Sequence, residues 1–404
     1  MKRVERSPTV CFVAPKNYPL LAGHGDLRHI GGAEVQRLLI ARELVRRGFA
    51  VRFVTLDYGQ PDGIEHEGIR VYKMCAAEAG WPGLRFVHPR WTSLWAALAR
   101  ADADVYYQRT AGVESGQVAL WCRRNRRTLV LAIASDIECD PRLPGKAARE
   151  RWFFHYALRR ADAVVAQTAL QARRLADQFG VAATVIRSCA PTPAETSPTV
   201  KRPPEPRVLW VGRFAAPKRP ELVLELATLC PEWHFDVVGE PNSPGSDRAY
   251  VYNALRALPN VTLHGFVPYA RIGARYGAAA LLLCTSAWEG YPNTFLEAWS
   301  RGLSVVSTVD PDGVIRRHGL GRIAGGSAHE LRAAIGTLLG DAGERAACAE
   351  RARRFFAAHH TVAAAGDAYE ALLRAVPAGR HASAPDAAGA APSARVGRQL
   401  GAVQ

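Results

Sequence analysis

Short apolar runs alternate with segments of helical periodicity along most of the chain, and this alternation is the feature that most restricts its fold. The first series opens with an apolar run at residues 10–14, a helical pattern over 33–47 that Gly48 ends, and a second apolar run at 50–56. Further apolar runs occupy residues 105–107, 129–134, 163–166 and 184–186. Strands and helices that alternate in this way form a mainly parallel sheet covered by helices on both faces, so the predicted fold class is α/β.

A second series follows a proline-rich segment. Residues 190–206 contain six prolines and little that could be buried, which predicts a linker over 191–206. Beyond it, apolar runs recur at 208–211, 233–238, 261–263, 279–284 and 304–307, with helices expected over 220–229 and from residue 294. The 404 residues exceed the roughly 250 to 300 at which single cores stop growing. We therefore predict two Rossmann-like domains, 1–190 and 207–342, on either side of the linker.

The C-terminal part is predicted to be helical over 343–376 and disordered over 377–404, where Ala, Gly, Pro and Ser predominate. No run of 18 apolar residues occurs, and the first residues lack an apolar leader, so a cytoplasmic protein is expected. The eight cysteines are scattered singly without metal-ligand spacing, which favours reduced, buried thiols.

The net charge of +15 calls for an anionic partner, but charge alone does not choose between nucleic acid, anionic lipid and nucleotide phosphates. The sequence has no RNA-binding signature and no basic stripe interleaved with stacking aromatics. Nucleic acid is therefore not expected as a partner.

The segment 286–308 carries the strongest sign of a ligand site. Asn293 is predicted to cap a helix that runs to Arg301 and that Gly302 ends. Because the helix starts at the carboxyl end of a strand, its free N–H groups face the crevice where α/β proteins bind phosphates. Glu289 and Glu297, eight positions apart, are suited to accept hydrogen bonds from vicinal hydroxyls of a sugar and a ribose. Taken alone, Glu297 is better explained as a solvated or salt-bridged helix residue, and Glu289 as an ordinary acid in a loop.

Two other segments point to the same crevice. The apolar run at 208–211 ends in Gly212, followed by Arg213 and, five residues later, Lys218; cations there can neutralise a departing diphosphate. The glycine-rich loop 23–34 lets backbone approach a ligand before a helix, although it is neither G-x-G-x-x-G nor a Walker A motif. The alternative for Arg213 and Lys218 is that they are ordinary surface cations, since the chain has 52 Lys and Arg, and the alternative for the glycine-rich loop is a flexible turn.

The order and spacing of these motifs resemble those of the family 4 retaining glycosyltransferases. The motifs are Gly31-Gly32-Ala33-Glu34, Val211-Gly212-Arg213 with Lys218, and Glu289-Gly290 through Leu296-Glu297-Ala298 with Gly302. The resemblance extends to about residue 376 and implies a GT-B fold, in which two Rossmann-like domains face a central cleft. A C-terminal helix around Tyr369 and Leu372 would cross back to the first domain.

The resemblance also implies that the second domain holds a nucleotide-sugar donor and the first domain the acceptor. Glu289 would contact hydroxyls of the donor sugar, Glu297 those of the ribose, and Arg213 and Lys218 the diphosphate. Further donor contacts are implied at Gly31, Gly32, Gly239, Glu240, Phe266, Val267, Asn293, Thr294 and Phe295. Neither a metal nor another cofactor is expected, because the cations and the helix end neutralise the diphosphate.

One departure from the family concerns the first domain. Family members usually carry a histidine after the strand that corresponds to 129–134, and it positions the sugar or relays a proton. This chain has Ser135 and Asp136 there. Asp136, Ser135 or Arg109 can take the place of this histidine. We place Asp136 with Arg213, Lys218 and Glu289 among the expected catalytic residues. The Asn-Gly that often precedes the hinge is also replaced, by Ser188-Cys189.

The implied activity is metal-independent, retaining transfer of a hexose from a UDP- or GDP-sugar to a glycan or lipid-linked acceptor, in cell-surface polysaccharide or glycolipid synthesis. The basic and aromatic segment 145–162 either rests on an anionic membrane or is an amphipathic core helix. Three alternative functions remain open: an inactive GT-B scaffold subunit, a sugar-nucleotide epimerase, and a phosphorylase, for which no pyridoxal-bearing lysine is identified.

Overall fold

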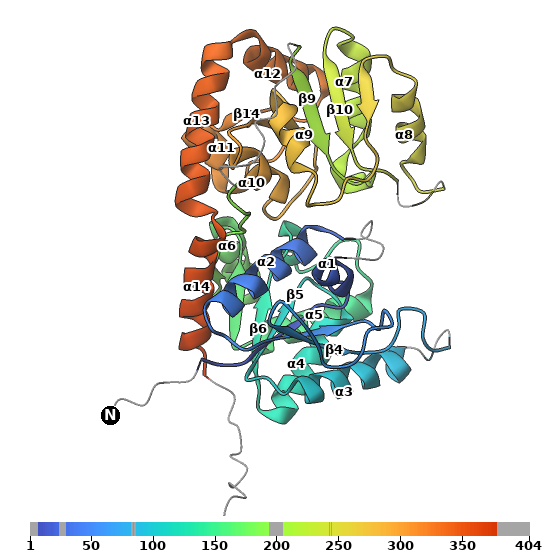
Figure 1. Ribbon diagram of the computed structural model, residues 1–404, viewed down its shortest axis with the longest axis vertical. Helices are drawn as coiled ribbons and strands as arrows, with labels where there is room; N and C mark the ends of the chain where they lie inside the picture. Colours follow the sequence, from blue (N-terminus) through green and yellow to red (C-terminus); the bar gives the residue numbers. More distant parts are fainter. Residues whose placement is uncertain are drawn as a thin grey trace, which may run out of the picture.

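The computed structural model describes residues 7–23, 30–81, 84, 86–193, 205–241, 243 and 245–377. Within these ranges the chain forms two α/β units, one above the other in Figure 1. The predicted disordered tail, most of the predicted linker and part of the glycine-rich loop fall at 378–404, 194–204 and 24–29, outside the described residues. Across the described part of the chain, no helix combines the length and the apolar character needed to cross a bilayer.

The first unit is built on an eight-stranded sheet with the order β3-β4-β2-β1-β5-β6-β7-β8. Its strands are β1 Val10–Val13, β2 Val51–Thr55, β3 Ile64–His66, β4 Ile69–Lys73, β5 Val105–Arg109, β6 Thr128–Ala132, β7 Ala163–Ala166 and β8 Thr184–Val185. Central β1 is buried along its whole length and pairs in parallel with β2 and β5, with Val10 opposite Val51 and Val105. A strand buried on both faces is a continuous apolar run, as the sequence showed.

Two apolar cores lie on opposite faces of this sheet. The helices that cover it are α1 Tyr18–Ala22, α2 Gly32–Arg46, α3 Thr92–Ala101, α4 Val113–Asn125, α5 Ala148–Arg160 and α6 Ala169–Phe179, with short helical turns η1 Phe86–Trp91 and η2 Asp136–Cys139. Side chains of α3, α4 and α5 contribute to one core, and those of α1 and α2 to the other. The α/β prediction is therefore confirmed.

The hairpin formed by β3 and β4 was not predicted from the sequence. These strands are antiparallel, and Glu67 and Gly68 between them both have positive φ, at 52° and 77°. Two-residue hairpin turns of this kind usually carry Asn-Gly or Asp-Gly, so the Glu-Gly pair gave only a weak signal.

The second unit has a six-stranded, all-parallel sheet with the order β11-β10-β9-β12-β13-β14. Its strands are β9 Arg207–Val211, β10 His234–Val238, β11 Val261–Leu263, β12 Leu281–Cys284, β13 Ser304–Ser307 and β14 Gly321–Ile323. Its helices are α7 Glu221–Leu229, α8 Ala249–Arg256, α9 Gly273–Ala278, α10 Asn293–Trp299, α11 Val314–His318 and α12 Ala328–Gly340, with turns η3 Ala216–Lys218 and η4 Pro311–Gly313. The edge strand β14 was not predicted.

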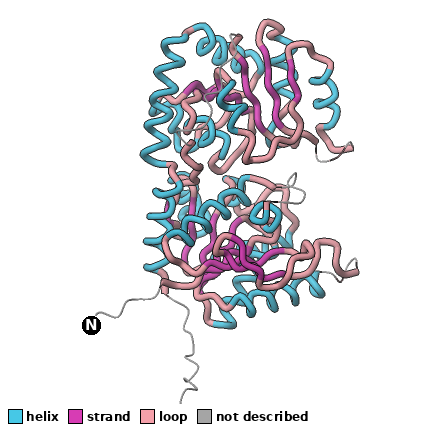
Figure 2. Tube along the Cα trace, viewed as in Figure 1, coloured by secondary structure: helices cyan, strands magenta, loops and turns pink. Residues whose placement is uncertain are grey.

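The C-terminal helices tie the two units together. The expected stretch 343–376 consists of two helices, α13 Ala342–His359 beside the second unit and α14 Val362–Ala375 beside the first (Figures 1 and 2). The hydroxyls of Tyr369 on α14 and Tyr107 on β5 lie 3.1 Å apart, and Arg47, just after α2, pairs with Asp367 and Glu370. The predicted return of the C-terminal helix to the first domain is confirmed.

His360 lies where α13 gives way to α14 and is fully buried. Its Nδ1 is 2.8 Å from the carbonyl oxygen of Ser188, which can only accept, so Nδ1 carries the proton and Nε2 accepts from the Tyr291 hydroxyl at 2.9 Å. Burial lowers the pKa of His360 to about 3, which keeps the ring neutral. The imidazole thus fixes three segments at the joint between the two units.

Candidate active site

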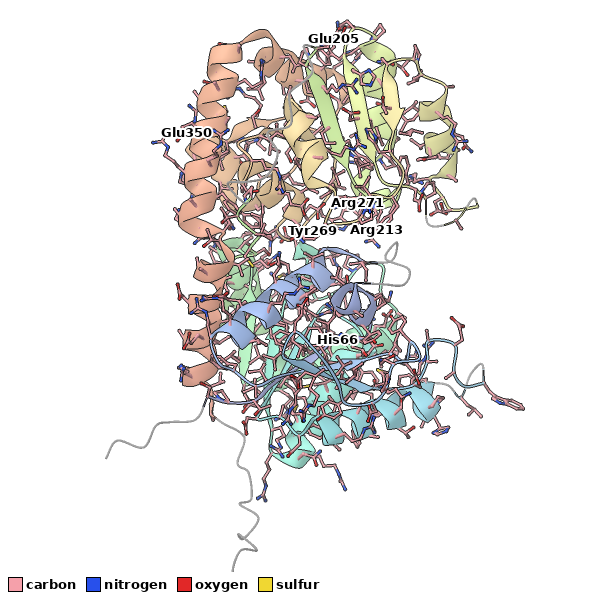
Figure 3. All side chains as sticks on the ribbon, viewed as in Figure 1. His66, Glu205, Arg213, Tyr269, Arg271 and Glu350 are labelled. Carbon is pink, nitrogen blue, oxygen red and sulfur yellow. The ribbon has the colours of Figure 1, made fainter. Side chains whose placement is uncertain are left out.

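A cavity of about 1050 Å³ separates the two units, and both supply its lining. The lining residues follow the carboxyl ends of parallel strands: Gly212 and Arg213 after β9, Gly239 after β10, Ser135 after β6 and Gln167 after β7. Figure 3 shows Arg213 and Tyr269 on the face of the second unit that is turned toward the first. Ligands of open α/β sheets bind in this position, as the sequence analysis expected.

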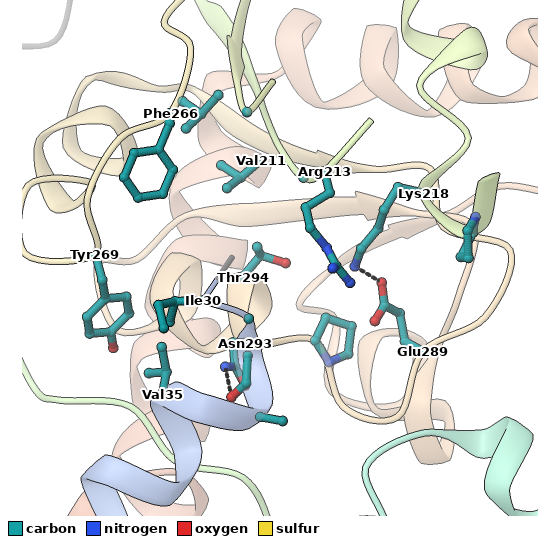
Figure 4. Close-up of a pocket in the computed structure, with 18 of the residues that line it drawn as sticks. Ile30, Val35, Val211, Arg213, Lys218, Phe266, Tyr269, Glu289, Asn293 and Thr294 are labelled. Atoms are coloured by element: carbon teal, nitrogen blue, oxygen red, sulfur yellow. Dashed lines mark hydrogen bonds and ion pairs between the residues drawn. The ribbon is translucent and has the colours of Figure 1, made fainter. Parts of the chain in front are cut away.

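Lys218 and Glu289 form an ion pair at one end of the cavity (Figure 4). Oε1 of Glu289 also accepts a hydrogen bond of 2.6 Å from the Ser286 hydroxyl. Lys218 and Glu289 were expected to have separate roles, the cation toward a diphosphate and the acid toward sugar hydroxyls. Their contact brings the cation and the acid to one point of the cavity.

Arg213 is exposed to the same cavity, and its side chain points toward the Lys218–Glu289 pair in Figure 4. Its guanidinium forms no ion pair or hydrogen bond with any residue that the structure describes. A guanidinium that faces a cavity without an internal partner can bind an anionic ligand through its planar edge.

The first turn of α10 lies between this cationic end and the rest of the cavity. Its cap is Pro292, and no side chain caps it, so the prediction that Asn293 is the N-cap is wrong. The Asn293 amide instead spans the two units: Nδ2 donates to the carbonyl oxygen of Gly32 at 3.1 Å, and Oδ1 accepts from Gln36 at 3.2 Å. Asn293 and Thr294 line the cavity, whereas Phe295 is fully buried in the core of the second unit.

Glu297 lines the cavity one turn further along α10 and is only 8% exposed. Burial raises the pKa of its carboxyl to about 7, against the opposing influence of Tyr276 and Arg301. A buried carboxylate that is not held in an ion pair is suited to bind hydroxyl donors of a ligand. Its burial was not evident from the sequence, in which a glutamate on a helix is usually solvated.

The loops after β10 and β11 complete the second wall with Gly239, Glu240, Phe266 and Val267. Gly239 has φ of 131°, and a Cβ there would overlap the carbonyl oxygen of Gly212. Only glycine therefore fits at this crossing of two loops. In Figure 4 the Phe266 ring lies away from the Arg213–Lys218–Glu289 group, with Thr294 between them, so one extended ligand could reach both ends.

The first unit contributes Gly31, Gly32, Arg109, Ser135 and Gln167 to the opposite wall. Gly31 caps α2, and its N–H is bound by the Glu34 carboxylate at 2.9 Å. Of the three residues expected to replace the family histidine, Ser135 and Arg109 line the cavity, and Asp136 does not. The Asp136 carboxylate accepts from Gln171 at 2.8 Å, and burial raises its pKa.

The structure therefore brings Arg213, Lys218, Glu289 and Glu297 to one cavity and leaves Asp136 and Phe295 outside its lining. Several lining residues were not predicted from the sequence, among them Gln167, Tyr252, Arg256, Tyr269 and Trp288, and Gly290 was named only as part of a motif, without a role. Gly290 marks a close approach of the two units, because a Cβ there would overlap the carbonyl oxygen of Ala134 and lie 2.6 Å from Nε2 of Gln167. The glycine within the Glu289-Gly290 motif was the available signal.

The chain belongs to the family 4, group 1 type glycosyltransferases, with a GT-B fold. Residues 31–192 match the glycosyl transferase 4-like domain, and residues 205–341 match the glycosyl transferases group 1 model. No curated protein sequence is significantly similar to the chain.

Solved glycosyltransferases share its fold at low sequence identity. Sucrose-phosphate synthase from Thermosynechococcus elongatus is 18% identical, with a TM-score of 0.75 over 91% of this chain and 98% of that one. HepE from Anabaena, solved with UDP and glucose, is 19% identical, with a TM-score of 0.71 over 91% and 99% of the two chains. WaaG, a glycosyltransferase involved in lipopolysaccharide biosynthesis, is 17% identical, with a TM-score of 0.65 over 91% and 100%.

Proposed function

We propose that the chain transfers a hexose, with retention, from a nucleoside-diphosphate sugar to a glycan or lipid-linked acceptor. The observation that carries this proposal is the convergence of Arg213, Lys218, Glu289 and Glu297 on one cavity between the two units. The cations match a diphosphate, Glu289 matches sugar hydroxyls beside it, and the buried Glu297 matches a ribose. The complex of HepE with UDP and glucose supports a donor of this class.

In the proposed reaction, the main contribution of the protein is to stabilise the departing diphosphate. Arg213 and Lys218 offer positive charge where that negative charge grows, and the sugar passes through an oxocarbenium-like state as the acceptor enters from the same face. We expect the cations and the start of α10 to serve without a metal. Activity unchanged by EDTA would agree with this, and activity lost with EDTA and restored by Mg²⁺ would contradict it.

Substitution of the two cations tests the proposal. Removal of one preorganised charge of this kind costs on the order of 3 kcal/mol, so Arg213→Ala or Lys218→Ala should lower turnover at saturating donor by more than about tenfold. Arg70→Ala, which removes an exposed side chain of β4, is the control and should retain activity. Wild-type turnover in both cavity variants would refute the role.

A thermal-shift screen against UDP-, GDP- and ADP-sugars identifies the donor, because a ligand that binds only the folded state raises the melting temperature. The variants Glu297→Gln and Arg213→Ala should each reduce the shift. If no nucleotide sugar raises the melting temperature of the wild-type protein, the proposed function is contradicted.

Peripheral contact with an anionic membrane is proposed for the exposed edge of α5. The structure divides the aromatic residues of this helix: Phe153 and Phe154 are buried, whereas Trp152 is 57% exposed and stacks on Tyr156. Arg149 lies over the ring of Phe86, which extends the basic and aromatic surface into η1. A liposome-flotation assay should show salt-sensitive binding that Trp152→Ala weakens. Membrane contact of this kind would put the enzyme at the inner face of a membrane, in cell-surface polysaccharide or glycolipid synthesis. Absence of binding to anionic vesicles would contradict this proposal.

The alternative of an inactive scaffold subunit has one observation in its favour, namely that Ser135 lines the cavity where family members carry a histidine. Such a subunit would bind the donor but neither hydrolyse nor transfer it. Detection of transferred sugar in an acceptor screen separates the two functions.

A further inference from the structure

Arg109 is an ionised side chain buried in the first-domain wall of the cavity. It is the last residue of β5, lines the cavity and is only 4% exposed. Gly31, Gly32 and Ser135 line the same wall. A guanidinium remains charged at physiological pH, so this wall carries a fixed positive charge and not a group that could relay a proton.

The described residues leave this charge without a carboxylate in contact. Nη1 of Arg109 has only a long hydrogen bond of 3.5 Å to the Tyr107 hydroxyl, and Nε is buried without a partner. Nη2 makes no hydrogen bond with a described residue. The neighbouring acid, Glu138, uses one oxygen on the N–H of Ala111 at 3.1 Å and the other on the N–H of Ala134 at 2.8 Å.

A second buried arginine increases the positive potential at this place. Arg37 on α2 donates to the carbonyl oxygen of Arg109 at 2.9 Å. Its carboxylate partner is Glu34, at 3.3 Å, whose other oxygen binds the N–H of Gly31. Glu34 is therefore engaged by Arg37 and Gly31, and the charge on Arg109 is left for another anion.

Buried charges in proteins are normally paired, because an unpaired one loses its hydration without compensation. Where a buried guanidinium lines a cavity and lacks an internal partner, a ligand anion can supply the missing pair. The planar edge of a guanidinium matches a carboxylate or a phosphate through two parallel hydrogen bonds.

We propose that Arg109 forms a subsite for an anionic group, a carboxylate or a phosphate, on the acceptor. This inference rests on the proposed function, because it takes the first-domain wall as the acceptor side. The second wall already has Arg213 and Lys218 for the donor diphosphate, so Arg109 supplies a separate positive charge on the opposite side of the cavity. The acceptor is therefore an acidic sugar or a sugar phosphate.

Binding of three probes to the full chain tests the subsite without requiring turnover. Glucose 6-phosphate, glucuronate and glucose are titrated by calorimetry, with UDP present to occupy the donor side. At least one anionic probe should bind more than about tenfold more tightly than glucose, since a charge-assisted pair is worth about that much or more. Comparison of the affinities for glucose 6-phosphate and glucuronate shows whether the subsite prefers a phosphate or a carboxylate.

Variants separate ligand binding from a structural role. Arg109→Gln should reduce the affinity for the preferred anionic probe to that for glucose, and Arg109→Lys should restore part of it. Tyr369→Phe removes the hydroxyl that meets Tyr107, disturbs the same buried network, and should leave the preference for the anion intact. If Arg109→Gln does not fold, the comparison of charged and neutral probes on the wild type still decides.

Equal affinity of all three probes for the wild type would overturn the subsite, and unchanged UDP binding in that experiment would leave the proposed function standing. Weakened UDP binding in Arg109→Gln, with the probe preference unaltered, would assign Arg109 to the donor and also overturn the inference.

Discussion

The second-domain wall of the cavity holds three carboxylates and three cations on loops and on helices α8 and α10, whereas the first-domain wall holds glycines, Ser135 and one buried arginine. On the second wall the charged groups lie next to each other, as in the Lys218–Glu289 pair. On the first wall Arg109 has no carboxylate in contact among the described residues. The charges of the second wall are therefore partly paired within the protein, whereas the charge of Arg109 on the first wall is not paired with a described carboxylate.

The largest expected effect comes from the second wall. Glu289→Gln removes the carboxylate that contacts Lys218 and Ser286, so both the sugar contact and the position of the cation are lost. Turnover should fall about 100-fold, as on removal of one preorganised polar group elsewhere. Steady-state kinetics at saturating donor measures it, and Glu225→Gln, on the exposed side of α7, is the control. A loss of less than about threefold would show that Glu289 only shapes the loop.

Close approach of the two walls is tested at Gly290. A Cβ there would overlap Ala134 of the first unit, so Gly290→Ala should hold the units apart and lower kcat/KM about tenfold, since misplacement of a reacting group by about 1 Å is costly. Gly340→Ala, at the end of α12, has open space around its Cβ and is the control. Unchanged kinetics in Gly290→Ala would mean that the enzyme works with the walls further apart.

The sequence predicted the second wall better than the first for a physical reason. Gly212 and Arg213 directly follow β9, and Glu289 lies in the loop after β12, so local pattern places them at one sheet edge. Asn293 shows the limit, since its amide binds Gly32 and Gln36 of the other unit instead of capping its own helix. The burial of Glu297 and the isolation of Arg109 likewise depend on packing between distant segments, which no local pattern encodes. The strand series could be predicted because buried parallel strands are continuous apolar runs. The β3–β4 hairpin could not be predicted, since its turn lacks the usual residues.

A pH profile tests the buried acid of the second wall. The pKa of Glu297 is raised to about 7 from its usual value near 4.5, so its ionised form, which accepts hydroxyl donors, predominates only above pH 7. The donor KM should therefore fall several-fold as pH rises through 7, and Glu297→Gln should abolish this change. The stability contribution has the opposite sign: it is fully present below pH 4.5 and is lost as pH rises through 7, so Glu297→Gln should flatten that part of the unfolding profile. A donor KM of Glu297→Gln that follows the wild-type profile would exclude the role.

The smallest effect is expected where the second unit caps a helix of the first. The Asp312 carboxylate accepts from the N–H groups of Ala169 and Leu170, at 2.8 and 2.9 Å, at the start of α6. Asp312→Ala should cost about 1 kcal/mol of stability, as loss of a cap generally does, and should raise the donor KM two- to threefold because the closed arrangement of the units loses a contact. Asp341 caps α13 within the second unit by accepting from Glu344, at 2.8 Å, so Asp341→Ala should show a similar stability loss without the change in KM. Equal KM values in the two variants would reduce Asp312 to an ordinary cap, and the approach of the two walls would then depend on Gly290, Asn293 and the His360 joint.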